Sequence, residues 1–347
     1  MLRLLHIFLV LLTLAAYLPP LINPASFWPI ATLGLGAPIL WFGLLLFAFY
    51  WLWKRDKTVL LSLITLLLGW DMISNAFAFN TSSKKAPSEV ITVVSLNGRN
   101  FQRERGEEKP DFYQRAAKYV AALDADLLLI QEFDIKRNRA NPLLAAIQQE
   151  AGYLHKVYQA RGPLVVLSRY RLSNSEINYF SNRANGFIVV DVESPQGTFR
   201  VFNVHLQTNA ISHLADEVTT TGDIRERGTW QKVKMMFGRY GRSNKVRTEQ
   251  ALDILAEMEQ SPHPVLVGGD FNDVPTSYLY QQFRLRVQDA HLKGSWGLGT
   301  TYKSFFPGLR IDYILPDHSF EVHDFERLPC SFSDHHAVRA VISWGSP

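Results

Sequence analysis

The sequence predicts an α/β (α+β) sandwich with mixed β-sheets, preceded by three transmembrane helices. The first 80 residues hold only six charged side chains, whereas the other 267 hold 62. Beyond residue 90, short β-branched runs alternate with helical patterns, and the runs within 187–204 are spaced like a hairpin. A composition that is 47% hydrophobic, without low-complexity tracts, excludes a disordered chain. The protein is therefore expected to combine an apolar region with a globular domain.

The apolar region is long enough for more than one membrane crossing. No Lys, Arg, Asp or Glu occurs from Leu4 to Trp53, and two proline-containing breaks divide this run. Each crossing needs about 20 apolar residues. A cleaved signal peptide is the alternative for the first segment, but two further apolar segments follow it. The predicted organisation is a membrane anchor at 1–79 with spans at about 4–22, 27–53 and 58–79, a linker at 80–89, and a globular domain at 90–347.

The short loops predict the orientation of this anchor. Lys54, Arg55 and Lys57 lie between the second and third spans, and the loop before them has no basic residue. Because basic loops stay in the cytoplasm, the N-terminus is predicted to be inside. Three crossings then make an integral protein of a bacterial inner or plasma membrane whose globular domain is extracytoplasmic. Lys84 and Lys85 argue weakly for the opposite orientation.

Periodicity predicts the elements of the globular domain in order. The segment 111–123 places Phe112, Ala116 and Val120 on one helical face. Short apolar runs bounded by polar residues read as buried strands. The expected strands are 90–96, 127–130, 164–167, 187–192, 199–204, 265–267, 311–315 and 337–342, and the expected helices are 111–123, 142–151 and 245–258.

Polar side chains follow or precede many of these strands. Because strand ends in a layered sheet can converge on one cleft, these residues are candidates for a single site. Each of them alone is a weak signal, and their joint occurrence is the evidence. The segments are Ser95-Leu96-Asn97, Ile130-Gln131-Glu132, Phe202-Asn203-Val204-His205, Gly269-Asp270-Phe271-Asn272, Arg310-Ile311-Asp312-Tyr313 and Ser333-Asp334-His335.

Three of these residues are typical ligands of a hard cation. Glu132 and Asp334 offer carboxylate oxygens, and Asn97 offers an amide oxygen. Oxygen ligands favour Mg²⁺ or Mn²⁺ over zinc, and the single cysteine excludes a multi-cysteine zinc site. The sequence therefore predicts Mg²⁺ (or Mn²⁺) as cofactor, which would clamp a phosphate.

The remaining polar residues suit proton transfer and phosphate binding. His335 can accept a proton from water near neutral pH, provided that a carboxylate such as Asp312 holds its ring. Asp270, Asn272 and His205 would then position the water and donate hydrogen bonds to phosphoryl oxygens. This chemistry predicts a hydrolase of phosphate esters.

The six segments, in this order, resemble the endonuclease/exonuclease/phosphatase superfamily, over about residues 90–344. This superfamily includes deoxyribonucleases, apurinic endonucleases, neutral sphingomyelinases and inositol-polyphosphate 5-phosphatases. The resemblance implies a four-layered sandwich and in-line attack of water on phosphorus. It also implies that Glu132, Asn97 and Asp334 hold the metal, that His335 is the general base paired with Asp312, that Asp270 and Asn272 align the nucleophile, and that His205 contacts the phosphate.

One position departs from the pattern of the family. Some nucleases of the family carry an acidic metal ligand two residues after the first Asn, where this chain has Arg99. A second metal on that side is therefore not expected. His336, next to the signature histidine, is interpreted as structural.

A basic segment lies between the His205 and Asp270 motifs. Residues 222–247 have a net charge of +6 and contain interleaved aromatic residues. Three interpretations compete: a solvated basic surface, a nucleic-acid contact, and a contact with an anionic bilayer. The residues of this segment taken as substrate-binding candidates are Arg225, Arg227, Lys232 and Lys234.

The membrane tether favours a substrate near the bilayer. The leading hypothesis is a phosphodiesterase or phosphatase acting on lipid head groups, with the lipid bilayer as a partner. A membrane-anchored metal-dependent nuclease is the first alternative, because fold does not choose among substrates. A catalytically inactive membrane scaffold or binding module is the second. No feature of the sequence indicates an obligate protein partner.

Overall fold

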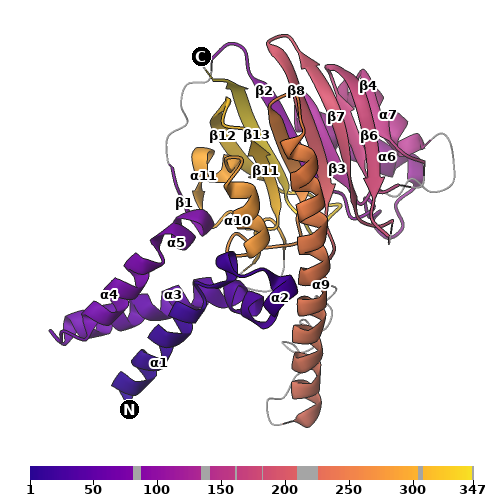
Figure 1. Ribbon diagram of the computed structural model, residues 1–347. Coiled ribbons are helices and arrows are strands. Elements are labelled where there is room, and N and C mark those ends of the chain that lie inside the picture. The colour runs from indigo at the N-terminus through magenta and orange to yellow at the C-terminus, as the bar shows by residue number, and fades with distance from the viewer. Residues whose placement is uncertain are drawn as a thin grey trace. The chain divides into compact units, whose positions relative to one another are not determined.

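Figure 1 shows the computed structural model, which describes residues 1–80, 87–133, 141–160, 162–181, 183–208, 226–303 and 308–345. The chain divides into two compact units. The first, called here the helical unit, contains Met1–Phe77, Gln207–Ala251 and Asp273–Gln282. The second, called the sandwich unit, contains Ala78–Leu206, Leu252–Asn272 and Phe283–Pro347.

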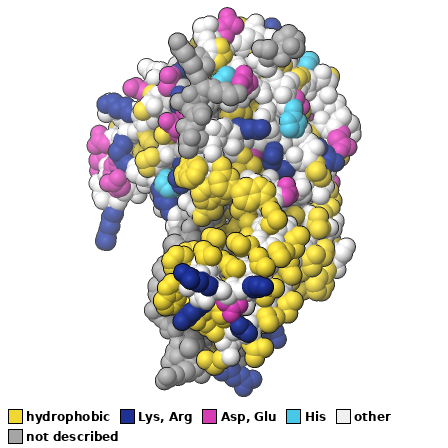
Figure 2. Space-filling view, turned by 90° about the vertical axis from the view of Figure 1, so that its left-hand side faces the viewer, with side chains coloured by type: hydrophobic (Ala, Val, Ile, Leu, Met, Phe, Trp, Pro, Cys, Tyr) yellow, Lys and Arg dark blue, Asp and Glu magenta, His cyan; other side chains and the backbone are white. Residues whose placement is uncertain are grey.

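The helical unit begins with a series of apolar helices. Two stretches, Leu2–Leu21 and Pro29–Trp53, are long and apolar enough to cross a membrane. Figure 2 shows a broad hydrophobic surface with a group of Lys and Arg side chains within it. The elements are α1 (Leu2–Ala15), η1 (Pro19–Leu21), α2 (Pro24–Phe27), α3 (Pro29–Trp53), α4 (Val59–Leu68) and α5 (Trp70–Ala76).

The segment expected as a third span is two helices rather than one. The axes of α4 and α5 differ by 66°, and only the two helices taken together are long and apolar enough to cross a membrane. Gly69 lies at the bend, where a Cβ atom would overlap the ring of Tyr17. The Tyr17 hydroxyl donates to the Thr65 carbonyl at 3.0 Å, which holds the ring there. The bend therefore has a packing cause, and the chain leaves α5 to form strand β1 at Ala78–Phe79.

Two mixed sheets form the sandwich unit. The six-stranded sheet has the order β12-β13-β2-β3-β5-β4, in which β2 and β3 run parallel. The five-stranded sheet has the order β11-β9-β8-β7-β6, in which β8 and β9 run parallel. The strands are β2 (Ile91–Asn97), β3 (Leu127–Gln131), β4 (His155–Tyr158), β5 (Val165–Ser168), β6 (Arg171–Tyr179), β7 (Gly186–Ser194), β8 (Gly197–His205), β9 (Val265–Asp270), β11 (Asp312–Pro316), β12 (Phe320–Leu328) and β13 (Ala337–Trp344).

The core consists of layers of apolar side chains. Val93 and Leu129 of the six-stranded sheet pack in one cluster with Val190 and Leu266 of the five-stranded sheet. A second cluster packs α6 (Lys109–Ala122) and α7 (Pro142–Ala151) against the six-stranded sheet. Asn141 accepts hydrogen bonds from the first turn of α7. The other helices are α9 (Arg227–Glu259), α10 (Tyr278–Arg284) and α11 (Ala290–Gly294), and β10 (Trp296–Gly297) pairs with β1.

These layers confirm the predicted α/β sandwich with two mixed sheets. The strands without a counterpart in the prediction include β4, β6 and β12, which lie at sheet edges. An edge strand carries more polar side chains, so its pattern is less apolar than that of a buried strand. Helix α9 begins 18 residues before the expected start at 245, so the described part of the basic segment is helical.

Candidate active site

The two parallel strand pairs bring four polar residues to the same end of the sandwich. Asn97 ends β2 and Glu132 follows its parallel neighbour β3. His205 and Asp270 end β8 and β9, where they are register partners. Asp312 opens β11 and is the register partner of Asp270 on the antiparallel side. The sheet topology therefore explains why residues far apart in sequence converge.

His335 and Asp312 form a hydrogen-bonded pair across the two sheets. The His335 Nδ1 atom lies 2.9 Å and 3.1 Å from the two carboxylate oxygens of Asp312, so Nδ1 donates to this carboxylate. The other ring nitrogen, Nε2, is 4.0 Å from Asp270 Oδ2. Thr301 Oγ1 accepts from the amide of Asp312, and Ser333 Oγ accepts from the amide of His335. The orienting partner expected for a general base is thus present.

Charge and burial shift the protonation of this pair and its neighbour. Burial alone would lower the pKa of His335, but the Asp312 carboxylate, assisted by Asp270 and Asp334, raises it to about 10. For Asp270, burial raises the pKa, and the negative charge of Asp312 adds to the effect. Without a cation, therefore, His335 is the protonated imidazolium at neutral pH.

Glu132, His205 and Asp270 form a group of donors that fits a divalent cation. Their ligand atoms lie within 4.8 Å of one another. The His205 Nδ1 donates to the Ala184 carbonyl at 3.0 Å, which turns Nε2 towards Glu132 and Asp270. This buried Nε2 has no hydrogen-bond partner among the described residues, and it lies 3.6 Å from Glu132 Oε1 and 3.9 Å from Asp270 Oδ2. The two carboxylates are suitable oxygen ligands for Mg²⁺ or Mn²⁺, whereas an imidazole nitrogen is a ligand that softer divalent metals prefer.

The two predicted asparagines contact the carboxylates through donor groups. The Asn97 side-chain nitrogen donates to Asp270 at 2.9 Å and to Glu132 at 3.1 Å, while its oxygen accepts from the Arg99 amide. The backbone amide of Asn272 donates to Asp270 Oδ1 at 2.8 Å. The Asn272 side-chain nitrogen donates to the Leu206 carbonyl. Both asparagines therefore hold Asp270 in place.

Among the described residues, Asp334 is not a member of either group of ligand atoms that lie within 4.8 Å of one another. Its carboxylate pairs with Arg99 at 3.1 Å, and the Arg99 side chain is 48% exposed. Arg99, Asn100 and Phe101 all have positive φ, which makes a tight left-handed turn. The Phe101 ring packs against the Phe133 ring and anchors this turn. Arg99 thus places a positive charge at the rim of the site, beside one predicted metal ligand.

Two neutral side chains beneath the site connect the sheets, a role that the sequence interpretation missed. The Gln131 side-chain nitrogen donates to Asn203 Oδ1 at 2.7 Å, from β3 to β8. The Asn203 side-chain nitrogen donates to the carbonyls of Ile130 and Val165. Both residues belong to the motifs identified in the sequence, but their burial was not evident from it. They fix the register between the two halves of the site.

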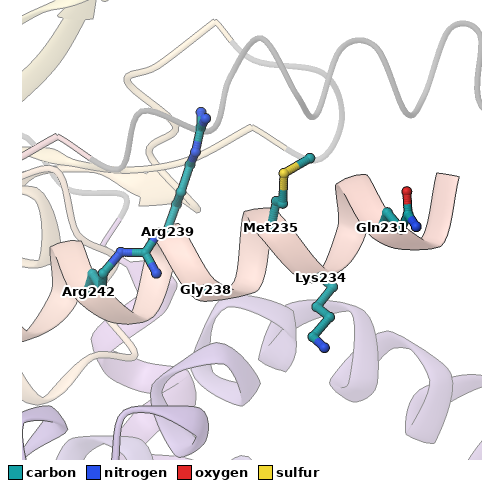
Figure 3. A pocket seen from close by; sticks show the side chains of 6 residues that line it. All are labelled: Gln231, Lys234, Met235, Gly238, Arg239 and Arg242. Carbon is teal, nitrogen blue, oxygen red and sulfur yellow. The ribbon is translucent and has the colours of Figure 1, made fainter. Parts of the chain in front are cut away.

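The basic candidates lie in the helical unit. Arg225 is outside the described residues, whereas Arg227, Lys232 and Lys234 belong to α9. An open groove of about 650 Å³ follows this helix (Figure 3). Lys234 and Arg239 point to different sides of the helix. The lining residues are Gln231, Lys234, Met235, Gly238, Arg239 and Arg242.

Both parts of the chain match known family models. Residues 79–335 match the model of the Endonuclease/Exonuclease/phosphatase family. Residues 1–76 match a domain of unknown function, DUF8431. No curated protein matches the chain significantly by sequence.

Solved structures resemble the sandwich. A family protein from Bacteroides thetaiotaomicron is 17% identical with a TM-score of 0.51, and the match covers 73% of this chain and 95% of that one. A functionally unknown conserved protein from Enterococcus faecalis V583 is 15% identical with a TM-score of 0.50, and the match covers 74% of this chain and all of that one. At this identity the likeness supports the fold alone.

Proposed function

Because the chain belongs to the endonuclease/exonuclease/phosphatase family, we propose that it is a metal-dependent hydrolase of phosphate esters. The observation that carries this proposal is the sharing of Asp270 by two groups. Asp270 lies with Glu132 and His205 in the cation-binding group, and with Asp312 and His335 in the group that contains the base. A base next to a cation-binding group is the arrangement that hydrolysis of a phosphate ester by water requires.

In this proposal, His335 is the general base. Its Nε2 takes a proton from the attacking water, and Asp312 holds the ring through Nδ1 and stabilises the imidazolium that forms. Asp270 lies 4.0 Å from the same Nε2 and orients the water for attack in line with the leaving oxygen. The hydrogen bonds from Asn97 and Asn272 keep Asp270 in the required position.

Glu132 and Asp270 would hold the Mg²⁺ or Mn²⁺ ion through their carboxylate oxygens, with Asn97 and His205 at their side. When bound, the ion supplies positive charge that stabilises the phosphoryl and leaving oxygens. A general base must be neutral before it can accept a proton, whereas the carboxylates around His335 raise its pKa to about 10. Positive charge beside Asp270 would offset the carboxylates and lower the pKa of His335 towards neutrality.

The membrane-facing features favour a lipid head group as the substrate. Two apolar helices can each cross a bilayer, and the sandwich unit begins at Ala78, after α4 and α5. A nuclease remains the second candidate, favoured by the exposed basic residues and exposed Trp230 and Phe237 on α9, because such surfaces bind polyanions. Substrate specificity is therefore the first property to measure.

The orientation proposed for the sandwich is extracytoplasmic. Arg3 pairs with Asp56 at 2.6 Å, so the N-terminus and the basic loop after α3 lie at the same end of the helices. If α4 and α5 complete a third crossing, the sandwich lies on the opposite side from this basic end. A C-terminal alkaline phosphatase fusion should then be active in bacterial cells, and a fusion active only as a cytoplasmic reporter would contradict the orientation.

The test of the activity uses the full chain in detergent micelles or vesicles with Mg²⁺. The substrates are phospholipids, sphingomyelin, inositol phosphates, RNA and plasmid DNA, each assayed with and without chelator. We expect chelator-sensitive hydrolysis of a lipid substrate. Sensitive hydrolysis of nucleic acid alone would support the nuclease instead. If no substrate is hydrolysed above the rate of His335→Ala, the chain acts as a binding module and the proposal is wrong.

A further inference from the structure

The sandwich unit carries a small exposed apolar patch where the chain enters it. Strand β1 (Ala78–Phe79) pairs antiparallel with β10 (Trp296–Gly297), so that Phe79 is the register partner of Trp296. Their rings meet edge to face with centroids 6.0 Å apart. Phe79 is 48% exposed and Trp296 is 57% exposed. Large aromatic side chains exposed together on a surface indicate a contact with another apolar phase.

The composition of the patch is that of a membrane interface. Leu298 is exposed beside the aromatic pair in sequence. Lys293 is also exposed, and its backbone carbonyl accepts a hydrogen bond from the Asn80 side chain. Trp, together with Lys, is typical of the level of the head groups, where an apolar body meets apolar chains and a polar tip meets water and phosphates. We call Phe79, Lys293, Trp296 and Leu298 the aromatic patch.

Chain length places the aromatic patch near the bilayer. Helix α5 ends at Ala76, and only Phe77 separates it from β1. At about 3.3 Å per residue, Phe79 is within roughly 10 Å of the end of α5 in any arrangement of the two units. Pairing with β10 gives Trp296 the same limit, because it is held against Phe79. If α4 and α5 belong to the membrane, the aromatic patch cannot move far from the head groups.

We propose that the aromatic patch inserts into the head-group region of the bilayer that holds α1 and α3. The sandwich then has a second point of attachment, formed by residues more than 200 positions apart in sequence, in addition to the covalent link after α5. Two attachment points restrict its rotation, so one side of the sandwich faces the lipid surface. The inference rests on membrane insertion of the apolar helices and does not depend on catalytic activity.

The test measures depth in the bilayer with the full chain in phosphatidylcholine and phosphatidylglycerol vesicles. Leu298→Cys is spin-labelled in a Cys330→Ala background, and collision rates with oxygen and with a water-soluble nickel chelate are compared. We expect oxygen to relax this label more efficiently than nickel does. Leu154→Cys, at a 75% exposed site of the same unit, is the matched control and should show the reverse. Phe49→Cys on α3 reports whether the helices are inserted.

Each outcome decides the inference. A nickel-accessible label at 298 with a lipid-exposed label at 49 overturns the inference and leaves the anchor intact. A nickel-accessible label at 49 overturns both. A label at 298 protected from both reagents indicates a protein contact and also overturns it. If the cysteine background does not fold, brominated lipids give a second measurement: the native chain should lose more tryptophan emission on their addition than Trp296→Phe does, and equal losses would overturn the inference.

Discussion

The two sheets contribute differently to the site. The five-stranded sheet supplies His205, Asp270 and Asp312, all of which are buried. On the side of the six-stranded sheet, Glu132 is 34% exposed and Arg99 is 48% exposed. Buried charges interact strongly and titrate together, whereas exposed charges are screened by water. We therefore call His205, Asp270 and Asp312 the floor of the site, because they are buried and interact strongly with nearby charges. We call Glu132 and Arg99 its rim, because they are exposed to solvent and to an incoming substrate.

The strongest test of this division removes the residue that connects rim and floor. His335 precedes a strand of the six-stranded sheet but pairs with Asp312 of the five-stranded one. His335→Ala should lower kcat/KM by about 10³-fold, because a positioned general base contributes roughly 10²- to 10⁴-fold. His336→Ala is the matched control, since it changes the adjacent histidine. A comparable loss in both variants would mean that the loop, and not the base, was damaged.

Removal of the exposed cation ligand should have the next largest effect. Glu132→Gln keeps the shape of the side chain but removes its charge, so kcat/KM at a fixed, subsaturating Mg²⁺ concentration should fall by about 10²-fold. Part of the loss should be recovered at higher metal concentration. Glu150→Gln, on the exposed side of α7, is the control for a lost carboxylate. Full activity of Glu132→Gln at low Mg²⁺ would exclude Glu132 from the metal site.

The floor predicts a pH dependence of metal binding. Burial and Asp312 raise the pKa of Asp270, and the carboxylates raise the pKa of His335 to about 10. Both shifts favour the protonated forms, which oppose a cation, so the affinity for Mg²⁺ should fall as pH falls. One linked proton gives up to about tenfold per pH unit. Calorimetric titrations in buffers of different ionisation enthalpy would count the protons released, and a pH-independent affinity between about pH 7 and pH 9 would contradict the prediction.

Arg99 should have the smallest effect, because it lies at the rim. The Arg99 side chain is 48% exposed, and an exposed charge pairs with an anionic group, here a substrate phosphate, with about 1 kcal/mol or less, which corresponds to roughly fivefold. Arg99→Ala should therefore raise KM by about fivefold and leave kcat nearly unchanged. Arg103→Ala provides the control at an exposed arginine nearby. A large fall in kcat would mean that Arg99 acts in the chemical step, which would contradict its placement at the rim.

The fold class and the convergence of the site were predictable because both depend on pattern. Apolar runs ending in polar residues identified Asn97, Glu132, His205 and Asp270, and the parallel pairing of their strands brings them together. The edge strands β4, β6 and β12 were harder to predict, because one side of an edge strand faces water and loses the apolar signal.

The contacts between side chains of the site could not be predicted from the sequence pattern. The ion pair between Asp334 and Arg99 depends on a turn in which three successive residues have positive φ. His205 is predicted to contact phosphate, and the structure adds that its Nε2 lies 3.6 Å from Glu132 Oε1 and 3.9 Å from Asp270 Oδ2. A sequence motif does not show which ring nitrogen of a histidine will donate a hydrogen bond to a backbone carbonyl, because this depends on how the two sheets pack.

The Gln131–Asn203 hydrogen bond has a consequence for how such a site can evolve. This bond joins β3 to β8 one residue before Glu132 and two residues before His205, and both partners are uncharged amides. A charged pair at the same place would add an electrostatic interaction with the ionisable groups nearby. Because the Gln131–Asn203 pair is neutral, it fixes the position of one sheet against the other without changing the charge of the site. Substitutions at the rim can therefore alter which ester is accepted while the spacing of the catalytic groups stays the same.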